Sequence, residues 1–432
     1  MTAAARADAE TLASARARTL FVLWATYGSF YLCRVNVSPA VPSIRQSLGI
    51  GALEMGFVLG ALKLGYAVGQ FFNGQLTERF GARRILGIGM LGSAVVTMLF
   101  VAAPSIPGVP AVNAMVVLAF ANGWFQAGGW PPTVKIAARW FPVEDRGRTM
   151  GILGTSYTLG SAAAFFVVGG LLDAVHGAWR VAFIVPPLLL ALSYVHTRLR
   201  LQESPPVAAA GAADLHLERL TVRDAIVATV GNGRIWILAL GLFGVDAVRY
   251  GFLDWVPSQL AEMQHTGALA AAAKTAILPV AGAAGMLSAS WATDRFFQSR
   301  RAPVGALLLV AVAVLTVAYR GVVALGTGPT VLCLALVGFC LFGAHILLVG
   351  TAAQDFAKRG ATAAAAGFVD FMGHVGAFSG DVVTGFLRKH YGWAGATAWW
   401  AFAATVAGLL VATLWRAKPA LPARVEVVAT QR

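Results

Sequence analysis

The segment Tyr31–Ser43, YLCRVNVSPAVPS, places Arg34 near the middle of the first strongly apolar stretch of a chain of 432 residues. A second segment, Ala247–Ser258 (AVRYGFLDWVPS), contains Arg249. In both segments the arginine is followed eight residues later by a Pro-Ser pair. Charged residues inside spanning segments mark functional sites, so two arginines at matching places in two halves of the chain indicate a pocket for an anion.

The composition of the chain identifies lipid as its main solvent. Hydrophobic residues make up 58% of the sequence and charged residues only 12%, about half of the roughly 25% found in soluble domains. Apolar runs of about 20 residues recur, each long enough to cross a ~30 Å hydrocarbon core as a helix. We therefore predict an all-α membrane protein.

Twelve transmembrane helices are predicted, six on each side of a long polar interval. Those of the first half cover residues 19–43, 54–78, 84–103, 111–141, 147–172 and 179–197. Those of the second half cover residues 234–260, 268–293, 303–325, 330–356, 362–387 and 393–415. We expect five parts: a cytoplasmic N-terminal tail (1–18), a six-helix bundle (19–200), a cytoplasmic linker (201–232), a second six-helix bundle (233–416) and a cytoplasmic C-terminal tail (417–432).

The net charge of +14 comes mainly from Lys and Arg in alternate loops. Basic residues are dense before the first span and after the even-numbered spans, and they are sparse in the loops between. Cytoplasmic loops of membrane proteins are enriched in Lys and Arg, so both termini are predicted to be cytoplasmic. The predicted location is the cell (inner) membrane, with multiple crossings of the lipid bilayer and no nucleic-acid partner.

An acid–arginine motif is repeated at the ends of the second and eighth spans. The first copy is GQLTERFGARR (Gly74–Arg84), and the second lies in ASWATDRFF (Ala289–Phe297). The interval Arg34–Arg79 is 45 residues, and the interval Arg249–Arg295 is 46. The near-equal length of these two intervals indicates a duplicated six-span unit. Transporters built from such repeats bind substrate near mid-membrane, between the halves.

The first copy resembles the loop motif of the major facilitator superfamily, in which an acid and basic residues latch helix ends on the cytoplasmic face. The resemblance implies twelve helices in two pseudo-symmetric six-helix bundles. The residues predicted to form this conformational latch are Gly74, Glu78, Arg79, Gly81, Arg83, Asp294 and Arg295.

Three further stretches resemble the organophosphate:phosphate antiporters, the group that contains the glycerol-3-phosphate and hexose-phosphate transporters. They are residues 129–147, residues 249–257, and the pair 341–350 and 367–376. The resemblance runs from about Leu20 to Trp415. It implies that arginines at positions 34 and 249 hold a substrate phosphate, and that Tyr66 matches a family tyrosine.

Physical arguments about Arg34 and Arg249 lead to the same site. A charge at the centre of a spanning helix costs about 2.5–3.5 kcal/mol on insertion scales, which favours a binding role. Guanidinium stays protonated and offers a planar fork to two phosphate oxygens. Two arginines facing an empty cavity repel, and a dianion relieves that repulsion, which favours obligatory exchange. The alternative is a structural ion pair of Arg249 with Asp246 or Asp254.

Lys63 supplies a further cation on the second span. The antiporters carry a substrate-side lysine at the position that Gln70 occupies here. Because Lys63 and Gln70 are seven residues apart, they share one face of a helix. We predict that Lys63 lines the cavity; the alternative is pairing with an intramembrane carboxylate.

Three residues depart from the family pattern near the predicted pocket. Tyr157 stands where the glycerol-3-phosphate branch has a substrate-contacting histidine, so the exact substrate stays open. His374 stands where the family often has tyrosine, and His345 where it has a small or amide residue. These three, with Tyr31 as a wall, complete the predicted substrate-binding residues.

Four intramembrane carboxylates balance charge or carry protons. Asp370, His374 and Asp381 share a face of the eleventh span, and such a ladder could carry a proton. It could equally neutralise Lys63 or the arginines. Asp246 and Asp254 have the same two interpretations.

We predict a secondary transporter that moves a phosphorylated or phosphonate organic anion by alternating access, with inorganic phosphate as the counter-substrate. Two alternatives remain: a proton-coupled carrier of carboxylates or other organic anions, and a transporter-like membrane sensor of a sugar phosphate. The sequence contains no nucleotide-binding loop, metal cluster or nucleophile triad. We therefore expect no enzymatic activity, no cofactor and no bound metal, and we expect a monomer.

Overall fold

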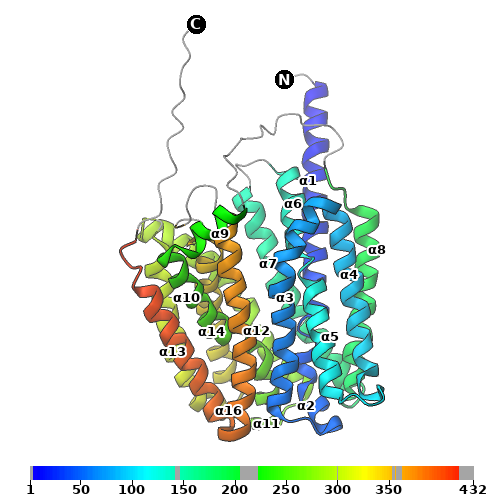
Figure 1. Cartoon of the computed structure of the whole chain (residues 1–432), viewed down its shortest axis with the longest axis vertical. Helices are drawn as coiled ribbons and strands as arrows, with labels where there is room; N and C mark the ends of the chain where they lie inside the picture. Colours follow the sequence, from blue (N-terminus) through cyan, green and yellow to red (C-terminus); the bar gives the residue numbers. More distant parts are fainter. Residues whose placement is uncertain are drawn as a thin grey trace.

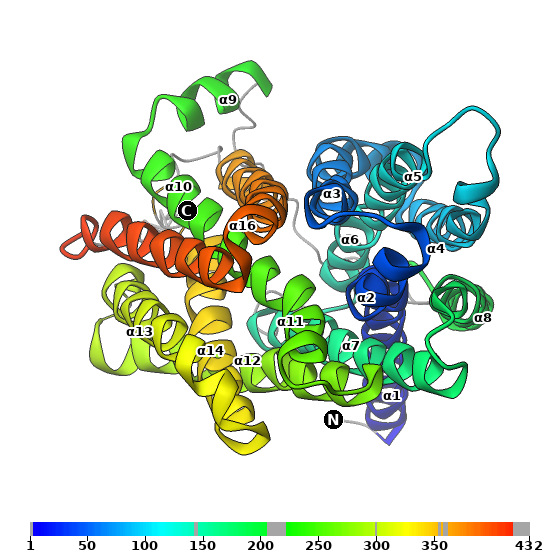
Figure 2. The same ribbon diagram turned by 90° about the horizontal axis from the view of Figure 1, so that it is seen from below.

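The computed structural model describes residues 3–141, 146–204, 222–298, 300–352, 356 and 362–417. Within these ranges the regular structure is entirely helical, which confirms the predicted fold class. Helices α1 to α8 gather on one side of the molecule and α10 to α16 on the other (Figure 1, Figure 2).

The two halves repeat a similar order of helices. The first half contains α1 (Ala3–Phe30), the 3-10 turn η1 (Tyr31–Cys33), α2 (Val37–Leu48), α3 (Ala52–Phe80), α4 (Ala82–Leu99), η2 (Phe100–Ser105), α5 (Ala111–Gln126), α6 (Trp130–Trp140), α7 (Arg146–Ala174), η4 (Trp179–Phe183) and α8 (Val185–Arg200). After the short helix α9 (Val222–Val230), the second half contains α10 (Gly233–Tyr250), the π-helical η5 (Gly251–Trp255), α11 (Val256–Met263), α12 (Ala268–Phe296), α13 (Arg301–Val322), η6 (Val323–Leu325), α14 (Thr327–Ile346), the π-helical η7 (Leu347–Ala352) and α16 (Thr362–Ala412).

The helices account for all twelve predicted crossings. Nine helical stretches of the described chain are long and apolar enough to cross a membrane. The last of these, in α16, crosses twice because the chain turns at Gly392 (φ 64°, ψ −161°). Two more crossings, α1–α2 and α5–α6, are each broken by a turn and lie outside the nine.

Two of the predicted segments contain helical residues. Because α1 begins at Ala3, most of the predicted N-terminal tail continues the first helix. The predicted linker includes α9, and its residues 205–221 lie outside the described ranges. The domain boundaries themselves stay predictions.

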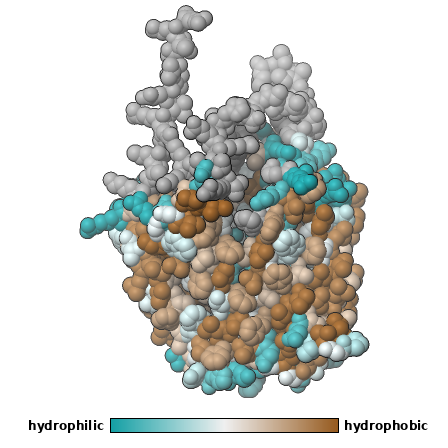
Figure 3. All heavy atoms as spheres, viewed as in Figure 1, coloured by the Kyte–Doolittle hydropathy of each residue, from teal (hydrophilic) through white to brown (hydrophobic). Residues whose placement is uncertain are grey.

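The outer surface is suited to hydrocarbon. On the face drawn in Figure 3, apolar residues cover the middle and hydrophilic residues gather at the two ends. Large apolar side chains such as Phe21, Val117 and Leu192 are more than 60% exposed. Soluble proteins rarely expose apolar surface on this scale, so this belt marks the part of the protein that the bilayer surrounds.

The duplication appears in the way glycines pack helices within each half. A Cβ at Gly65 of α3 would lie 2.0 Å from a backbone oxygen of α5, and one at Gly123 of α5 would lie 2.0 Å from a backbone oxygen of α3. The second half repeats the arrangement between α12 and α14, at 2.0 Å for Gly285 and 2.3 Å for Gly338. Small residues allow such close approach where no aqueous hydrophobic effect drives helices together.

The halves meet closely at the end that holds α2 and α11, called here the distal end; α1 begins and α16 finishes at the opposite, terminal end (Figure 1). The carboxylate of Asp173 on α7 accepts hydrogen bonds from the backbone N–H groups of Ala268 (2.9 Å) and Leu269 (3.2 Å), at the start of α12. A Cβ at Gly56 of α3 or at Gly385 of α16 would lie 2.6 or 2.5 Å from a backbone oxygen of the opposite half. The distal end is therefore closed.

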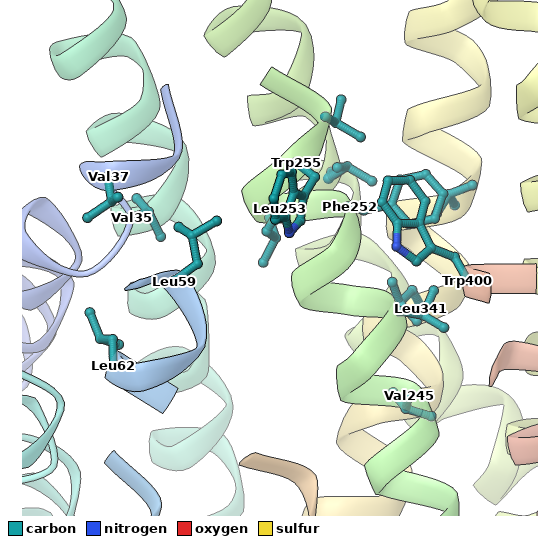
Figure 4. Close-up of a cluster of buried hydrophobic side chains, with 14 of the residues drawn as sticks. Val35, Val37, Leu59, Leu62, Val245, Phe252, Leu253, Trp255, Leu341 and Trp400 are labelled. Carbon is teal, nitrogen blue, oxygen red and sulfur yellow. The ribbon is translucent and has the colours of Figure 1, made fainter. Parts of the chain in front are cut away.

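An apolar core continues from one half to the other. Figure 4 shows Val35, Leu59 and Leu62 of the first half opposite Leu253 and Trp255 of the second, all within one cluster of buried side chains. This packing surrounds the charged residues described next.

Candidate functional site

Arg34 lies where the first crossing is broken. The turn η1 ends at Cys33 and α2 begins at Val37, so Arg34 occupies the gap between two helical segments. Its backbone N–H donates to the carbonyl of Tyr31 at 3.2 Å. The side chain is only 7% exposed. The helix break thus holds a charged side chain inside an apolar bundle.

The guanidinium of Arg34 is held by aromatic and amide groups. Nη1 donates to the Tyr31 hydroxyl at 2.9 Å, and Nε donates to Oε1 of Gln126 at 3.2 Å. Its central carbon lies 4.7 Å from the ring centroid of Tyr31 and 4.3 Å from that of Tyr66. Nη2 is buried without a hydrogen-bond partner, and no described carboxylate forms an ion pair with this arginine. Arg34 therefore carries an uncompensated charge and a free hydrogen-bonding edge.

Arg249 occupies the last turn of α10, directly before the π-helical η5. Its Nε lies 3.0 Å from Oδ1 of Asp246, as an ion pair without hydrogen-bond geometry. The guanidinium carbon lies 4.7 Å from the ring centroid of Tyr250 and 5.8 Å from that of Phe342. The structure thus shows the ion pair between Arg249 and Asp246, which was one of the alternatives in the sequence analysis. Asp254 pairs with other residues.

Three aromatic side chains connect the two arginines. The ring of Tyr31, beside Arg34, stacks with that of Tyr157 at a centroid distance of 6.3 Å. Tyr157 in turn stacks with Phe342, beside Arg249, at 6.4 Å. The structure therefore brings Arg34, Tyr31, Tyr157 and Arg249 into one site between the halves.

Tyr66 connects this site to α16. Its ring stacks on the imidazole of His374 at 4.6 Å, and its hydroxyl accepts a hydrogen bond from Nε2 of Gln70 at 2.7 Å. Nδ1 of His374 lies 3.0 Å from the carbonyl oxygen of Asp370 and 3.7 Å from its carboxylate. Gln70, at the position of the family lysine, thus orients a tyrosine that covers Arg34.

His345 lies beside the second arginine. Its Nε2 is 3.4 Å from Oδ1 of Asp246, the same oxygen that faces Arg249. Asp246 is completely buried, so its carboxylate has two nitrogen-bearing neighbours and no access to solvent.

Lys63 belongs to a buried ionic cluster that joins the halves, and it lines one small pocket together with Arg34. Its Nζ contacts Asp254 and lies 2.9 Å from Oδ2 of Asp381. None of these three side chains is more than 4% exposed. Ser38 donates to Oδ1 of Asp254 at 2.5 Å, and the indole of Trp255 donates to Oδ1 of Asp381 at 3.2 Å. The structure thus shows the carboxylate pairing that was the alternative for Lys63, and its contact with substrate stays a prediction.

The carboxylates of α16 are divided between two environments. Asp370 lies against His374, whereas Asp381 contacts Lys63 and Trp255. The proposed ladder along one helix face is therefore two separate groups in this structure.

The predicted latch of the first half lies at the turn between α3 and α4. Gly81 has φ 88°, a conformation that glycine adopts without steric cost. The Arg83 guanidinium donates to the carbonyl of Arg198, and Arg79 lies over the ring of Phe80 at 5.3 Å. The side chain of Glu78 lies outside the described part of the structure.

The remaining latch residues have simpler surroundings. In the second half, Asp294 pairs with Arg301 at 2.8 Å, and Arg295 is exposed. A Cβ at Gly74 would meet nothing within 4 Å, so close packing does not require glycine there.

Glu203, which the sequence analysis missed, closes the turn between α3 and α4. Its Oε1 accepts hydrogen bonds from the backbone N–H of Ala82 at 3.2 Å and from Nη1 of Arg139 at 2.7 Å. Burial by itself would raise the pKa of Glu203, but the Ala82 hydrogen bond and the charge of Arg139 prevail and place that pKa below its ordinary value. Glu203 lies 121 residues from Ala82 in the chain, so no local signal in the sequence could have identified this contact.

Two residues beside the arginines were also missed. Gln126 fixes Arg34, and it could have been noticed as an amide within an apolar span. Phe342 lies between Tyr157 and Arg249, and nothing in its sequence context separates it from a core phenylalanine.

A duplicated helical bundle with buried charges between its halves defines a polytopic membrane transport protein. The chain belongs to the Major Facilitator Superfamily, whose family profile matches residues 23–381. It is 28% identical over 385 residues to the glycerol-3-phosphate transporter of Bacillus subtilis (strain 168), which covers 85% of each chain.

A second relative is the membrane sensor protein UhpC of Salmonella typhimurium, 26% identical over 410 residues, or 92% of this chain and 90% of UhpC. These relatives confirm the predicted resemblance to the organophosphate:phosphate antiporter group. The fold matches that of a bacterial homolog of the human lysosomal transporter Spinster in an inward-facing, unoccupied conformation. That match has a TM-score of 0.73 at 15% identity and covers 93% of this chain and 95% of the other.

Proposed function

We propose that the protein exchanges a phosphorylated or phosphonate organic anion for inorganic phosphate across the membrane by alternating access. The observation that carries this proposal is the pair Arg34 and Arg249, one from each half, connected by aromatic rings. The B. subtilis relative, named a glycerol-3-phosphate transporter, supports the same class of substrate.

The chemistry of the site favours a dianion. Arg34 has a buried Nη2 without a partner and no acid at ion-pair distance among the described residues. A phosphate oxygen would complete its hydrogen bonds and compensate its charge. A second oxygen can reach Arg249 when that guanidinium leaves Asp246. The rings of Tyr31 and Tyr157 would cover the organic part of the substrate.

The charges of the two arginines also explain why transport would require exchange. Without an anion, closing the halves brings two guanidinium groups together in a low-dielectric site, which is costly. A bound dianion removes that cost, so the loaded carrier changes conformation more readily than the empty one. Each half of the transport cycle would therefore require bound substrate or bound phosphate.

The charge distribution supports an orientation for the cycle. Basic loops at the terminal end favour a cytoplasmic location for that end under the positive-inside rule. The distal end would then face outward, so the structure corresponds to a state closed to the outside.

Counterflow tests the proposal. Liposomes containing the full chain are loaded with unlabelled phosphate, diluted into labelled phosphate, and challenged with a panel of organic phosphates, phosphonates and carboxylates. Exchange should persist after a protonophore collapses the proton gradient, and it should be lost in Arg34→Lys because lysine cannot bind two oxygens in a planar fork. Uptake that needs the gradient and ignores external phosphate would favour the proton-coupled alternative.

A sensor is the second candidate, because the Salmonella relative is named a membrane sensor protein. It predicts saturable binding of a labelled organic phosphate to the purified chain with no counterflow. Parallel binding and flux measurements on one preparation separate the two functions.

A further inference from the structure

A cavity of about 520 Å³ opens at the distal end, and its lining shares no residue with the site around Arg34 and Arg249. Its walls come from α2, from the turn into α3, from α11 and from the turn of α16 at Gly392. The charged and aromatic residues of this distal cavity are Arg45, Glu54, Glu262, Arg388, Lys389 and Trp393.

Positive charge exceeds negative charge in this wall. Arg45, Arg388 and Lys389 are opposed by two acids, Glu54 and Glu262, which leaves one positive charge. Arg45 and Arg388 both contact Oε1 of Glu262, so their two guanidinium groups lie close together. The two arginines thus repel each other, and a further anion would reduce that repulsion.

Arg388 lines this cavity and has an unused hydrogen-bond donor. Its side chain is 8% exposed, and its guanidinium carbon lies 4.5 Å from the ring centroid of Trp393 and 6.0 Å from that of Trp255. Nη2 donates to Glu262, whereas Nη1 is buried and has no hydrogen-bond partner among the described residues. A guanidinium fixed by aromatic rings, with one nitrogen free, is prepared for an oxyanion.

The carboxylate of Glu262 already places one anionic group between cations of this cavity. Its Oε1 contacts Arg388 and lies 3.3 Å from Nη1 of Arg45, while its Oε2 accepts a hydrogen bond from Trp393 at 2.9 Å. Arg45 comes from the first half, and the other three residues come from the second. One carboxylate therefore bridges cations of both halves, but it leaves a positive charge and a free Nη1.

We propose that the distal cavity is a second anion site, which takes a phosphate-type oxyanion between Arg45 and Arg388 beside Glu262. An anion shared by two halves binds best when they are together, so it stabilises the distally closed state. Phosphate on the distal side would thus slow the opening of that end. The inference rests on the proposed function only for the choice of phosphate as the anion.

Distances between spin labels test this site directly. Cysteines replace Gln46 on α2 and Tyr391 on α16, both exposed, in a chain whose Cys33, Cys333 and Cys340 are replaced by serine. Pulsed electron paramagnetic resonance then follows the distance in nanodiscs as phosphate replaces chloride at constant ionic strength. All samples carry Arg34→Lys, which disables the central site.

Phosphate should increase the population with the short distal distance. Arg388→Gln should raise the half-maximal phosphate concentration at least about tenfold, because a charge-assisted hydrogen bond is lost. Lys389→Gln, at an exposed side chain, should raise it by a smaller factor. Arg320→Gln makes the same charge change on an exposed residue outside the cavity and should leave it unaltered.

Two results would overturn the site: no phosphate response in the Arg34→Lys background, or equal half-maximal concentrations in Arg388→Gln and Arg320→Gln. Nanodiscs with and without phosphatidylglycerol identify the source of the anion, since closure by this lipid alone assigns the site to a headgroup phosphate. Failure of the proposed function has a different signature. Absent phosphate counterflow with an intact distal response refutes only the exchange function, and the reverse refutes only the distal site.

Discussion

The ammonium of Lys63 lies 2.9 Å from Oδ2 of Asp381, across the boundary between the two halves, and it also contacts Asp254. Removing one member of a buried ionic cluster leaves unpaired charges in a low-dielectric interior. We expect Lys63→Met to lower the free energy of unfolding by about 3–5 kcal/mol. Reversible unfolding in mixed micelles measures this change.

A second substitution provides the control for this cluster. Adding Asp381→Asn to Lys63→Met removes one of the two carboxylates that would be left unpaired. The double variant should therefore recover part of the lost stability. A Lys63→Met protein as stable as the parent would show that the cation does not stabilise this interface.

The glycine contacts give a matched pair of stability predictions. Gly65→Ala places a Cβ 2.0 Å from a backbone oxygen of α5, so α3 and α5 must separate, at a cost of about 2 kcal/mol. Gly321→Ala in α13 meets nothing within 4 Å and should be neutral or stabilising by up to about 1 kcal/mol. The same unfolding assay compares them, and equal losses would show that close helix contact is not the cause.

Crossings and buried charges could be predicted because each is a local feature of the sequence. Arg34 and Arg249 stand out as charges within apolar runs, and a single residue carries that signal. The repeated interval to the acid–arginine motif predicted the duplication, which recurs in the glycine packing at Gly65 and Gly285. Hydropathy alone does not show helix breaks such as that at Arg34, because the broken segments remain apolar.

The partner of each buried charged side chain could not be predicted, because the two residues of a pair lie far apart in the chain. Lys63 meets Asp254 across 191 positions, and neither helix periodicity nor spacing selects that acid over Asp370. Arg34 meets Gln126 across 92 positions for the same reason. The sequence therefore identified which residues carry charge between the halves, and three-dimensional packing decided how those charges are paired.

The Glu203 contact predicts a pH dependence of stability at the terminal end. The pKa of Glu203 lies below its ordinary value, so its hydrogen bonds stabilise the fold above about pH 4.3, the usual pKa of glutamate. That contribution is lost as the pH falls through the lower, folded-state pKa. Because Glu203 and Arg139 are 29% and 42% exposed, the effect is at most about 1 kcal/mol.

Glu203→Gln should therefore be less stable than the parent at neutral pH, and the difference should vanish as the pH falls below the folded-state pKa of Glu203. Arg139→Gln removes the same ion pair from its other side and should lose less, because the Ala82 hydrogen bond to Glu203 remains. Unfolding measured from neutral to acidic pH checks both variants. A stability difference that does not change with pH would contradict the assignment to Glu203.

The two arginines of the central site differ in what an arriving phosphate must displace. Arg34 has no acid partner among the described residues, whereas Arg249 faces Asp246 at 3.0 Å. Asp246 also faces His345 at 3.4 Å. The carboxylate of Asp246 thus competes with substrate for Arg249 while it keeps the empty site closer to neutral.

Asp246→Asn should therefore bind inorganic phosphate about tenfold more tightly, which corresponds to about 1.4 kcal/mol of competition removed. The same change should slow exchange, because release must then leave Arg249 without a counter-charge. Equilibrium binding of labelled phosphate and counterflow rates measure the two effects. Asp294→Asn is the control, since Asp294 pairs with Arg301 outside the central site, and it should change affinity by less than about threefold. Weaker phosphate binding in Asp246→Asn would mean that Asp246 positions Arg249 for the substrate instead of competing with it.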